Sequence, residues 1–284
     1  MTDTALRTLF LGHSPDPDDA FMHWALAKDK LDTGDLRFEH KLEDIESLNQ
    51  RATRGEYEIT AVSIHGYAYV ADQYALLNHG ASMGENYGPR IVAREGMNLE
   101  DLQKGKGKRL AIPGEWTSAH LATQLRIGEY DYGLVAFDKI QDVVEQGEYD
   151  AGVLIHEGQL TFQEQGLVLL DDLGVWWANE TDGLPLPLGG NTVRRDLLDL
   201  IPDVSRLLKE SIAFGLDHRE EAVAYALDFG RGLDLAQADE FIAMYVNART
   251  LDYGDDGREA VRLFLQRAVD AGMIPGMPEL DFVR

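Results

Sequence analysis

Residues 55–69 (GEYEITAVSIHGYAY) and 147–160 (GEYDAGVLIHEGQL) decide the fold, because they repeat one pattern 92 positions apart. Each stretch begins with Gly-Glu-Tyr and an acidic residue, continues as a short apolar run and reaches an Ile-His pair. The apolar runs predict buried strands, which place His65 and His156 at their carboxyl ends. Ligands of open α/β sheets bind outside those ends. The repeat therefore predicts two similar lobes that offer polar groups to one cleft between them.

The sequence upstream of each strand repeats as well. Residues 8–14 (TLFLGHS) and 109–118 (RLAIPGEWTS) both lead from an apolar strand into a turn with Pro or Gly and then into a helical pattern. A hydroxyl or carboxylate residue is available to cap each helix. Any α/β protein repeats such units, but two units in the same order with matching ends favour an old duplication.

The order of the predicted elements indicates a mixed α/β protein of two lobes. Two sets of βαβ units are followed by a helical tail from Val193 onwards, which is expected to pack on the first set. This places lobe one at residues 1–94 plus 193–284 and lobe two at residues 95–192, with linkers near 93–95 and 189–192. A layout of this kind permits hinge closure on a ligand.

The composition narrows the classes of partner. The 284 residues carry a formal net charge of −24 without a run rich in Lys or Arg, so neither nucleic acid nor an anionic membrane is an expected partner. There is no cysteine, which excludes disulfides and thiolate chemistry. No apolar run approaches the roughly 20 residues of a membrane span, and no secretion signal is recognisable, so a cytoplasmic protein is expected. The sequence leaves the oligomeric state open.

His156 is the first candidate for chemistry, because Glu157 and a glycine follow it at the predicted strand end. An imidazole has an unperturbed pKa of about 6.5 and can act as a general base at neutral pH. The alternative is a structural histidine that satisfies a buried backbone carbonyl. Glu157 is the candidate partner that would orient the ring.

Hydroxyl residues near turns form a second group of candidates. Thr117 and Ser118 open a helix, where hydroxyls and free N–H groups bind a carboxylate or phosphate; plain N-capping is the alternative. Ser14 lies in the corresponding turn of the first unit, where carboxylates such as that of Asp18 oppose an anion. By two-residue alternation Ser63 shares a side of its strand with His65, so the two either face the cleft or satisfy loop backbone.

Motifs for a metal or a nucleotide cofactor are missing from the sequence. It has no HExxH, no GxGxxG follows the first strand, and residues 80–89 (GASMGENYGP) are not a Walker loop. The eight histidines are scattered, and the carboxylates of residues 16–19 lack the glycine and glutamate of an EF-hand. Neither a metal nor a cofactor is therefore expected.

Several motifs resemble those of the 1,4-dihydroxy-6-naphthoate synthase family, which belongs to the futalosine route to menaquinone. They occur in the family's order along nearly the whole chain: SPDPDDAF (14–21), LEDIESLN (42–49), GPRIVAR (88–94), IPGEWTSAHL (112–121), LIHEGQLTF (154–162), DLGVWW (172–177) and LPLPLGG (184–190). The Ile-His-Glu strand end and the LPLPLGG loop are the most specific of these motifs.

The resemblance implies an α/β fold of two lobes with a central cleft, like type II periplasmic binding proteins. It also implies a lyase that cleaves cyclic dehypoxanthinyl futalosine, a small anionic aromatic substrate, to 1,4-dihydroxy-6-naphthoate and dihydroxyacetone without a cofactor. The family's catalytic base falls on His156. Its substrate-binding residues fall on Ala61, Val62, Ser63, Thr117 and Ser118.

Some positions depart from the family's pattern. The family usually has Asn in place of Asp18 and Lys in place of Ala61, so the first-lobe site lacks a cation. His65 stands where a small residue is usual, and it is expected to replace that charge or to narrow the cleft. A Ser-Arg pair after His156 is replaced by Gly-Gln. Two other functions remain open: a relative like chorismate dehydratase, and a protein that closes on a small anion without chemistry.

Overall fold

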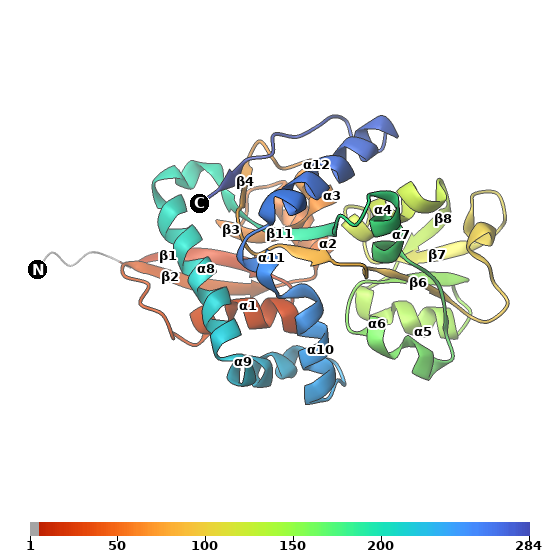
Figure 1. The fold of residues 1–284 in the computed structure, drawn as a ribbon, viewed down its shortest axis with the longest axis horizontal. Coiled ribbons are helices and arrows are strands. Elements are labelled where there is room, and N and C mark those ends of the chain that lie inside the picture. Colours follow the sequence, from red (N-terminus) through yellow and green to blue (C-terminus); the bar gives the residue numbers. More distant parts are fainter. Residues whose placement is uncertain (1–5) are drawn as a thin grey trace, which may run out of the picture.

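The computed structural model describes residues 6–284 and consists of two α/β lobes, each built on its own sheet (Figure 1). The first sheet has seven strands in the order β12-β4-β11-β3-β1-β2, with β5 beside β11. The second has five strands in the order β10-β6-β9-β7-β8. The two-lobe fold predicted from the sequence is therefore confirmed. Residues 1–5 of the predicted first lobe lie outside the described part.

The strands of the first sheet come from both ends of the chain. They are β1 (Arg7–His13), β2 (Leu36–Leu42), β3 (Ile59–Ser63), β4 (Tyr74–Leu77), β5 (Ser82–Gly84), β11 (Leu186–Arg194) and β12 (Phe282–Val283). The strands of the second sheet form one continuous region: β6 (Arg90–Ala93), β7 (Arg109–Ile112), β8 (Asp131–Leu134), β9 (Ala151–Leu154) and β10 (Val168–Asp172).

The helices of the N-terminal part and of the tail pack together on the first lobe. The helices of this lobe are α1 (Pro17–Ala27), α2 (Ile45–Ala52), α3 (Ile64–Tyr67), α8 (Ile201–Asp217), α9 (Arg219–Ala226), α10 (Leu235–Tyr245), α11 (Ala248–Leu251) and α12 (Gly254–Asp270). Apolar side chains of α1 form a buried cluster with α8, α9 and α10, which includes Phe21, Ile212, Val223 and Phe241. The predicted packing of the tail on the first lobe follows from this cluster.

The remaining helices follow the strands of the second sheet. They are α4 (Ser118–Ile127), α5 (Ile140–Glu145), α6 (Gly158–Thr161) and α7 (Leu173–Glu180). Short 3₁₀ turns complete the chain: η1 (Leu99–Leu102), η2 (Phe137–Lys139), η3 (Phe162–Gln165), η4 (Arg195–Leu200) and η5 (Leu227–Phe229). Among the described residues, none of the helices has the length and apolar character of a membrane span.

The two lobes share one topology, as the repeated stretches predicted. In the first lobe β1 lies between β2 and β3, and in the second lobe β7 lies between β8 and β9. All four of these pairs are parallel. An antiparallel strand then joins the third strand: β11 pairs with β3, and β6 pairs with β9. The two third strands, β3 and β9, are the repeated apolar runs, and every residue in them is buried.

The lobe boundaries need to be moved at both crossings. The predicted linkers near 93–95 and 189–192 assign β6 to lobe one and most of β11 to lobe two, whereas β6 belongs to the second sheet and β11 to the first. Both are antiparallel strands whose partners lie far away in the chain, so local sequence does not indicate their sheet. We propose that the chain crosses before β6 and between β10 and β11.

Candidate active site

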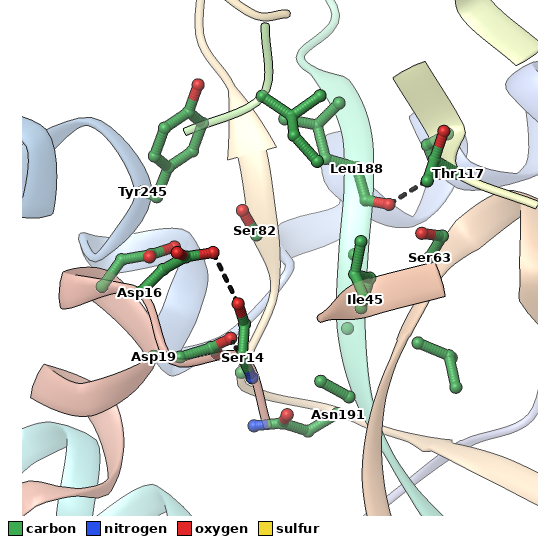
Figure 2. A pocket seen from close by; sticks show the side chains of 18 of the residues that line it. Ser14, Asp16, Asp19, Ile45, Ser63, Ser82, Thr117, Leu188, Asn191 and Tyr245 are labelled. Atoms are coloured by element: carbon green, nitrogen blue, oxygen red, sulfur yellow. Dashed lines mark hydrogen bonds between the residues drawn. The ribbon is translucent and has the colours of Figure 1, made fainter. Parts of the chain in front are cut away.

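A cavity lies where the carboxyl ends of β1 and β3 meet the first turn of α4 from the other lobe (Figure 2). Six of the eight residues predicted for the site line it: Ser14, Ala61, Val62, Ser63, Thr117 and Ser118. His65 and His156 do not line it. The strand ends and helix start that the sequence indicated are thus brought together, although the two histidines lie behind the wall.

Ser63 is held at the end of β3 by a buried amide. The Ser63 N–H donates to Asn49 Oδ1 over 2.8 Å, and Asn49 Nδ2 donates to Ser63 Oγ over 3.2 Å. Asn49 belongs to α2, which packs against the same strand. A Cβ atom at Gly66 would come within 2.6 Å of Asn49 Oδ1, so glycine is required there for the chain to turn so closely.

The hydroxyls of Thr117 and Ser118 are already engaged. Thr117 is the N-cap of α4: its Oγ1 accepts from the His120 N–H at 3.2 Å and donates to the Gly114 carbonyl at 2.8 Å. Ser118 Oγ donates to the Leu188 carbonyl at 2.6 Å and accepts from the His65 N–H at 3.1 Å. The capping alternative therefore applies to Thr117. The first-turn N–H groups of α4, in the cavity wall, are what this end offers an anion.

The opposite side of the cavity is acidic. Figure 2 shows Asp16 and Asp19 beside Ser14, across from Ser63 and Thr117. The Ser14 N–H donates to Asp19 Oδ2 at 2.9 Å, and its hydroxyl donates to Asp16 Oδ2 at 2.5 Å. Neither Lys nor Arg occurs among the described residues of the wall. A ligand carboxylate would therefore be repelled here and favoured at α4.

Two carboxyls of the cavity wall, those of Asp19 and Asp18, have a raised pKa and stay protonated to unusually high pH. Burial, followed by repulsion from Asp16, raises the pKa of Asp19 to about 7. Burial and repulsion from Asp19 and Asp16 raise the pKa of Asp18 well above its ordinary value. A protonated carboxyl donates as well as accepts hydrogen bonds. The sequence reasoning treated Asp18 only as a fixed negative charge and missed this property, which depends on burial.

Other cavity residues were not predicted. The stretch LPLPLGG supplies Leu188 and the following glycines, and β11 continues to Asn191. Asn191 is 1% exposed, and its Nδ2 has no hydrogen-bond partner within residues 6–284. Tyr245 comes from the end of α10 and donates to Gln159 Oε1 at 3.0 Å. Only the LPLPLGG motif signalled this wall, since Tyr245 lies in an ordinary helical pattern.

His65 has a structural setting. Strand β3 ends at Ser63 and His65 lies on α3, so the predicted strand alternation between these residues is wrong. The residue is 4% exposed, and its Nδ1 lies 3.3 Å from the Thr117 carbonyl oxygen. Burial lowers the pKa of His65 to about 4. The ring is therefore neutral at pH 7 and does not supply the positive charge expected of it.

His156 lies in the turn between β9 and α6, directly after cavity residue Ile155 in the chain. Its ring is 5% exposed; Nε2 is 2.6 Å from the Phe137 carbonyl oxygen, and Nδ1 accepts from the Gly158 N–H at 3.0 Å. Both contacts are satisfied by the neutral ring with its proton on Nε2. The structure thus contains the carbonyl contact of the structural alternative together with the predicted neighbour Glu157.

The pKa of His156 shifts in the opposite direction to that of His65. Burial is the largest influence and lowers the pKa, but hydrogen bonding and attraction from Glu157, with smaller effects of Asp16 and Phe137, raise it above its ordinary value. Glu157 Oε2 lies 3.5 Å from His156 Nδ1. The pair is buried, and this ring has a carboxylate that stabilises a proton taken up by it.

The two lobes also contact each other through residues next to Ile45 and Thr117 of the cavity wall. The Trp116 N–H donates to Glu46 Oε2 at 3.0 Å, and the Trp116 indole stacks on Tyr69 with ring centroids 5.0 Å apart. Asn49 Nδ2 also lies 3.4 Å from the Trp116 carbonyl oxygen.

Within residues 6–284, no group of histidines and carboxylates has the arrangement of a metal site.

Comparisons with known proteins extend over nearly the whole chain. The sequence model of the menaquinone biosynthesis family matches residues 9–270. A 1,4-dihydroxy-6-naphthoate synthase from Thermus thermophilus is 37% identical over 279 residues, covering 98% of this chain and 100% of the relative. One from Streptomyces coelicolor is 35% identical over 279 residues, covering 95% of this chain and 96% of the relative.

Solved structures agree with the architecture. A protein from Archaeoglobus fulgidus superposes with a TM-score of 0.89 at 40% identity, over 96% of this chain and 100% of that chain. An alkanesulfonate-binding protein from Xanthomonas axonopodis has a TM-score of 0.69 at 13% identity, over 95% of each chain, which shows the periplasmic-binding-protein-like fold alone. From its sequence relatives, the chain belongs to the 1,4-dihydroxy-6-naphthoate synthase family of menaquinone biosynthesis.

Proposed function

We propose that this protein is a carbon–carbon lyase that cleaves cyclic dehypoxanthinyl futalosine to 1,4-dihydroxy-6-naphthoate and dihydroxyacetone. The observation that carries the proposal is the convergence of the predicted substrate contacts of both lobes on one cavity. It occurs in a chain that matches two naphthoate synthases over nearly its full length. The proposed reaction takes place in the cytoplasm, which stays a prediction from the sequence.

The asymmetry of the cavity supports one orientation of the substrate. Its carboxylate is placed at the N-terminal turn of α4, where N–H groups and the helix dipole favour negative charge. The hydroxylated, sugar-derived part is placed at the other side, where Ser14, Asp19 and Asn191 provide donors and acceptors. Apolar residues such as Ile45 and Leu188 lie between these ends and suit the aromatic part.

The proposed base is His156. Its neutral imidazole removes the acidic proton of the substrate, the bond to the three-carbon fragment breaks, and formation of the aromatic ring provides driving force. Both ring nitrogens have partners in the structure, and Nε2 carries the proton of the neutral ring. The mechanism therefore requires the ring proton to move to Nδ1, toward Glu157, and the unprotonated Nε2 to exchange the Phe137 carbonyl for substrate. Glu157 then stabilises the imidazolium through Nδ1. Closure of the lobes excludes water and orients the reacting groups.

Asp19 is a second candidate for proton transfer. Unlike His156 it lines the cavity, and its pKa of about 7 suits acid–base catalysis at neutral pH. If Asp19 is the base, His156→Asn keeps most of the turnover, whereas Asp19→Asn loses it. If His156 is the base, the two variants behave in the opposite way.

The test is to incubate the protein with cyclic dehypoxanthinyl futalosine and to measure both products by chromatography. We expect equal amounts of naphthoate and dihydroxyacetone from wild type, and almost none from His156→Asn. The exposed His218 provides a matched control, because His218→Asn changes an imidazole far from the described cavity. Failure of the wild type to form naphthoate would refute the proposed reaction.

The alternatives predict different results in the same experiment. A relative like chorismate dehydratase would consume chorismate and leave the futalosine derivative unchanged. A binding protein would take up the futalosine derivative, measured by calorimetry, without forming either product. This second alternative is tested because the chain shares its fold with an alkanesulfonate-binding protein.

A further inference from the structure

Arg231 joins the two lobes beside the proposed catalytic histidine. It lies in the first lobe's tail, between η5 and α10. Its Nη1 donates to Asp16 Oδ1 at 2.9 Å and to Glu157 Oε1 at 3.0 Å, and its Nη2 donates to the Pro15 carbonyl at 3.1 Å. The Arg231 N–H adds a contact of 3.3 Å to Glu157 Oε1. One residue thus links the acidic turn after β1 with the turn after β9.

The two oxygens of Glu157 have different surroundings. Oε1 receives the Arg231 contacts, while Oε2 is buried without a hydrogen-bond partner in the described part of the chain. This unpartnered Oε2 lies 3.5 Å from His156 Nδ1. A buried carboxylate oxygen left in this way is costly unless it gains a donor. A proton on Nδ1, in the tautomer whose unprotonated Nε2 can act as the base, supplies that donor.

Arg231 also touches the other partner of His156. Its guanidinium lies 4.7 Å from the centre of the Phe137 ring, a cation–π distance. The carbonyl of the same Phe137 lies 2.6 Å from His156 Nε2. Arg231 therefore contacts two of the residues beside the imidazole, Glu157 by an ion pair and Phe137 by its ring.

The network reaches the cavity through Asp16. This carboxylate binds Arg231 through Oδ1 and accepts the Ser14 hydroxyl through Oδ2, and Ser14 lines the cavity. Asp16 and Arg231 both belong to the first lobe, whereas Glu157 and His156 belong to the second. Opening of the lobes would leave the Arg231–Asp16 contact within its lobe and separate Arg231 from Glu157.

We infer that Arg231 is a positioning residue: closure brings its guanidinium to Glu157 and Phe137, which orients His156 for proton removal. The inference rests on the proposed function. His156 can then act as a base mainly when the lobes are closed and the substrate is enclosed. The charged and titratable groups that face His156 are Glu157, Asp16 and Arg231, and each takes part in this network.

The test compares full-length wild type with Arg231→Gln and Arg231→Lys in naphthoate formation as a function of pH. We expect Arg231→Gln to lower kcat by roughly 5- to 150-fold, the usual range of coupling between two sites, with a smaller change in KM. The acid limb of the kcat profile should move to higher pH, because loss of a cation favours the imidazolium. Arg231→Lys should restore part of kcat.

Arg219→Gln is the matched control. Arg219 forms a 2.7 Å ion pair with Asp239 inside the same tail and does not reach the other lobe. It should keep the wild-type kcat and acid limb. The inference is overturned if Arg231→Gln keeps them too, or if its loss of kcat follows only a lower melting temperature while the acid limb stays in place.

Small-angle scattering separates this inference from the proposed function. If wild type forms no naphthoate, the proposed reaction fails and the link between the lobes is judged by scattering alone. We expect Arg231→Gln to have a larger radius of gyration than wild type and Arg219→Gln, since the ion pair across the lobes is lost. Equal radii for all three proteins would contradict the link.

Discussion

The two Ile-His turns follow equivalent strands but place their histidines in opposite electrostatic settings. His65 is followed by Gly66, lies against the Thr117 carbonyl and has a pKa of about 4 because it is buried. His156 is also buried, but the adjacent Glu157 more than offsets burial and raises its pKa. One neighbouring carboxylate thus separates a histidine that stays neutral from one that can take up a proton.

Packing in the first lobe explains why the first turn has Gly66 where the second has Glu157. Any side chain at position 66 would collide with Asn49, which holds the end of β3. The first turn therefore has no space for a counterpart of Glu157. The second turn faces Arg231 and has a partner for that carboxylate. We therefore propose a structural role for the first turn and a catalytic role for the second.

The largest expected effect comes from His156→Asn. We expect a folded protein whose kcat is lower by roughly 10²- to 10⁴-fold, the usual contribution of a general acid–base group. Steady-state kinetics and circular dichroism measure the two properties. Near wild-type turnover would mean that the second turn, like the first, has only a structural role.

A smaller effect is expected from Asp19→Asn, in the binding of substrate at alkaline pH. Above its pKa of about 7, Asp19 is ionised and places a negative charge in the cavity, so KM for an anionic substrate should rise with pH. We expect a rise of roughly two- to tenfold, because the substrate carboxylate is placed across the cavity, where repulsion is weaker than the about 1–4 kcal/mol of charges 4 Å apart. KM of the variant should rise less with pH than that of wild type; a parallel rise in both proteins would assign the effect to another group, such as Asp18.

Acid should weaken the fold through buried histidines that, like His65, have a lowered pKa. Burial lowers the pKa of His13 to about 3, and its Nε2 lies 3.0 Å from His40 Nδ1. Burial also lowers the pKa of neighbouring His23 well below its ordinary value. Since the unfolded chain binds these protons near pH 6.5, stability is complete above that pH and is lost as pH falls.

The expected slope is about 1.4 kcal/mol per pH unit for each such histidine below about pH 6. Asp19 acts in the opposite sense, because its raised pKa makes the folded state bind more protons than the unfolded state. Urea unfolding of wild type and His13→Gln at successive pH values measures the slope. A slope that is identical in the two proteins would exclude His13 as a contributor.

The smallest effect on turnover is expected from His65→Ala. The substitution removes the contact with the Thr117 carbonyl and loosens the first turn of α4, where the substrate carboxylate is placed. We expect KM to rise by roughly two- to tenfold, the worth of one hydrogen bond, with kcat nearly unchanged. A larger loss in kcat than in KM would make the two turns functionally alike.

Local patterns in the sequence predicted much of the fold. The apolar runs, the turns with Pro or Gly and the repeated order of elements predicted the two lobes and the convergence of Ser14, Ser63 and Thr117. These features depend on neighbours within a few residues. The sheet membership of β6 and β11 depends instead on distant antiparallel partners, and it was missed.

The properties missed at the site depend on burial and on contacts across the lobes. Asp19 is an ordinary carboxylate in the sequence, and it is burial, followed by repulsion from Asp16, that raises its pKa to about 7. Arg231 lies 74 positions from Glu157 in a stretch without any motif. No periodicity or spacing indicates that these two residues meet.

A crystal structure with bound 1,4-dihydroxy-6-naphthoate would test most directly whether the second turn carries the chemistry. We predict the naphthoate carboxylate at the N–H groups of Ser118 and Ala119, with His156 Nε2 turned from the Phe137 carbonyl to the ligand. A ligand bound in the cavity while His156 keeps its contact with Phe137, or a ligand bound outside the cavity, would contradict the role assigned to this imidazole.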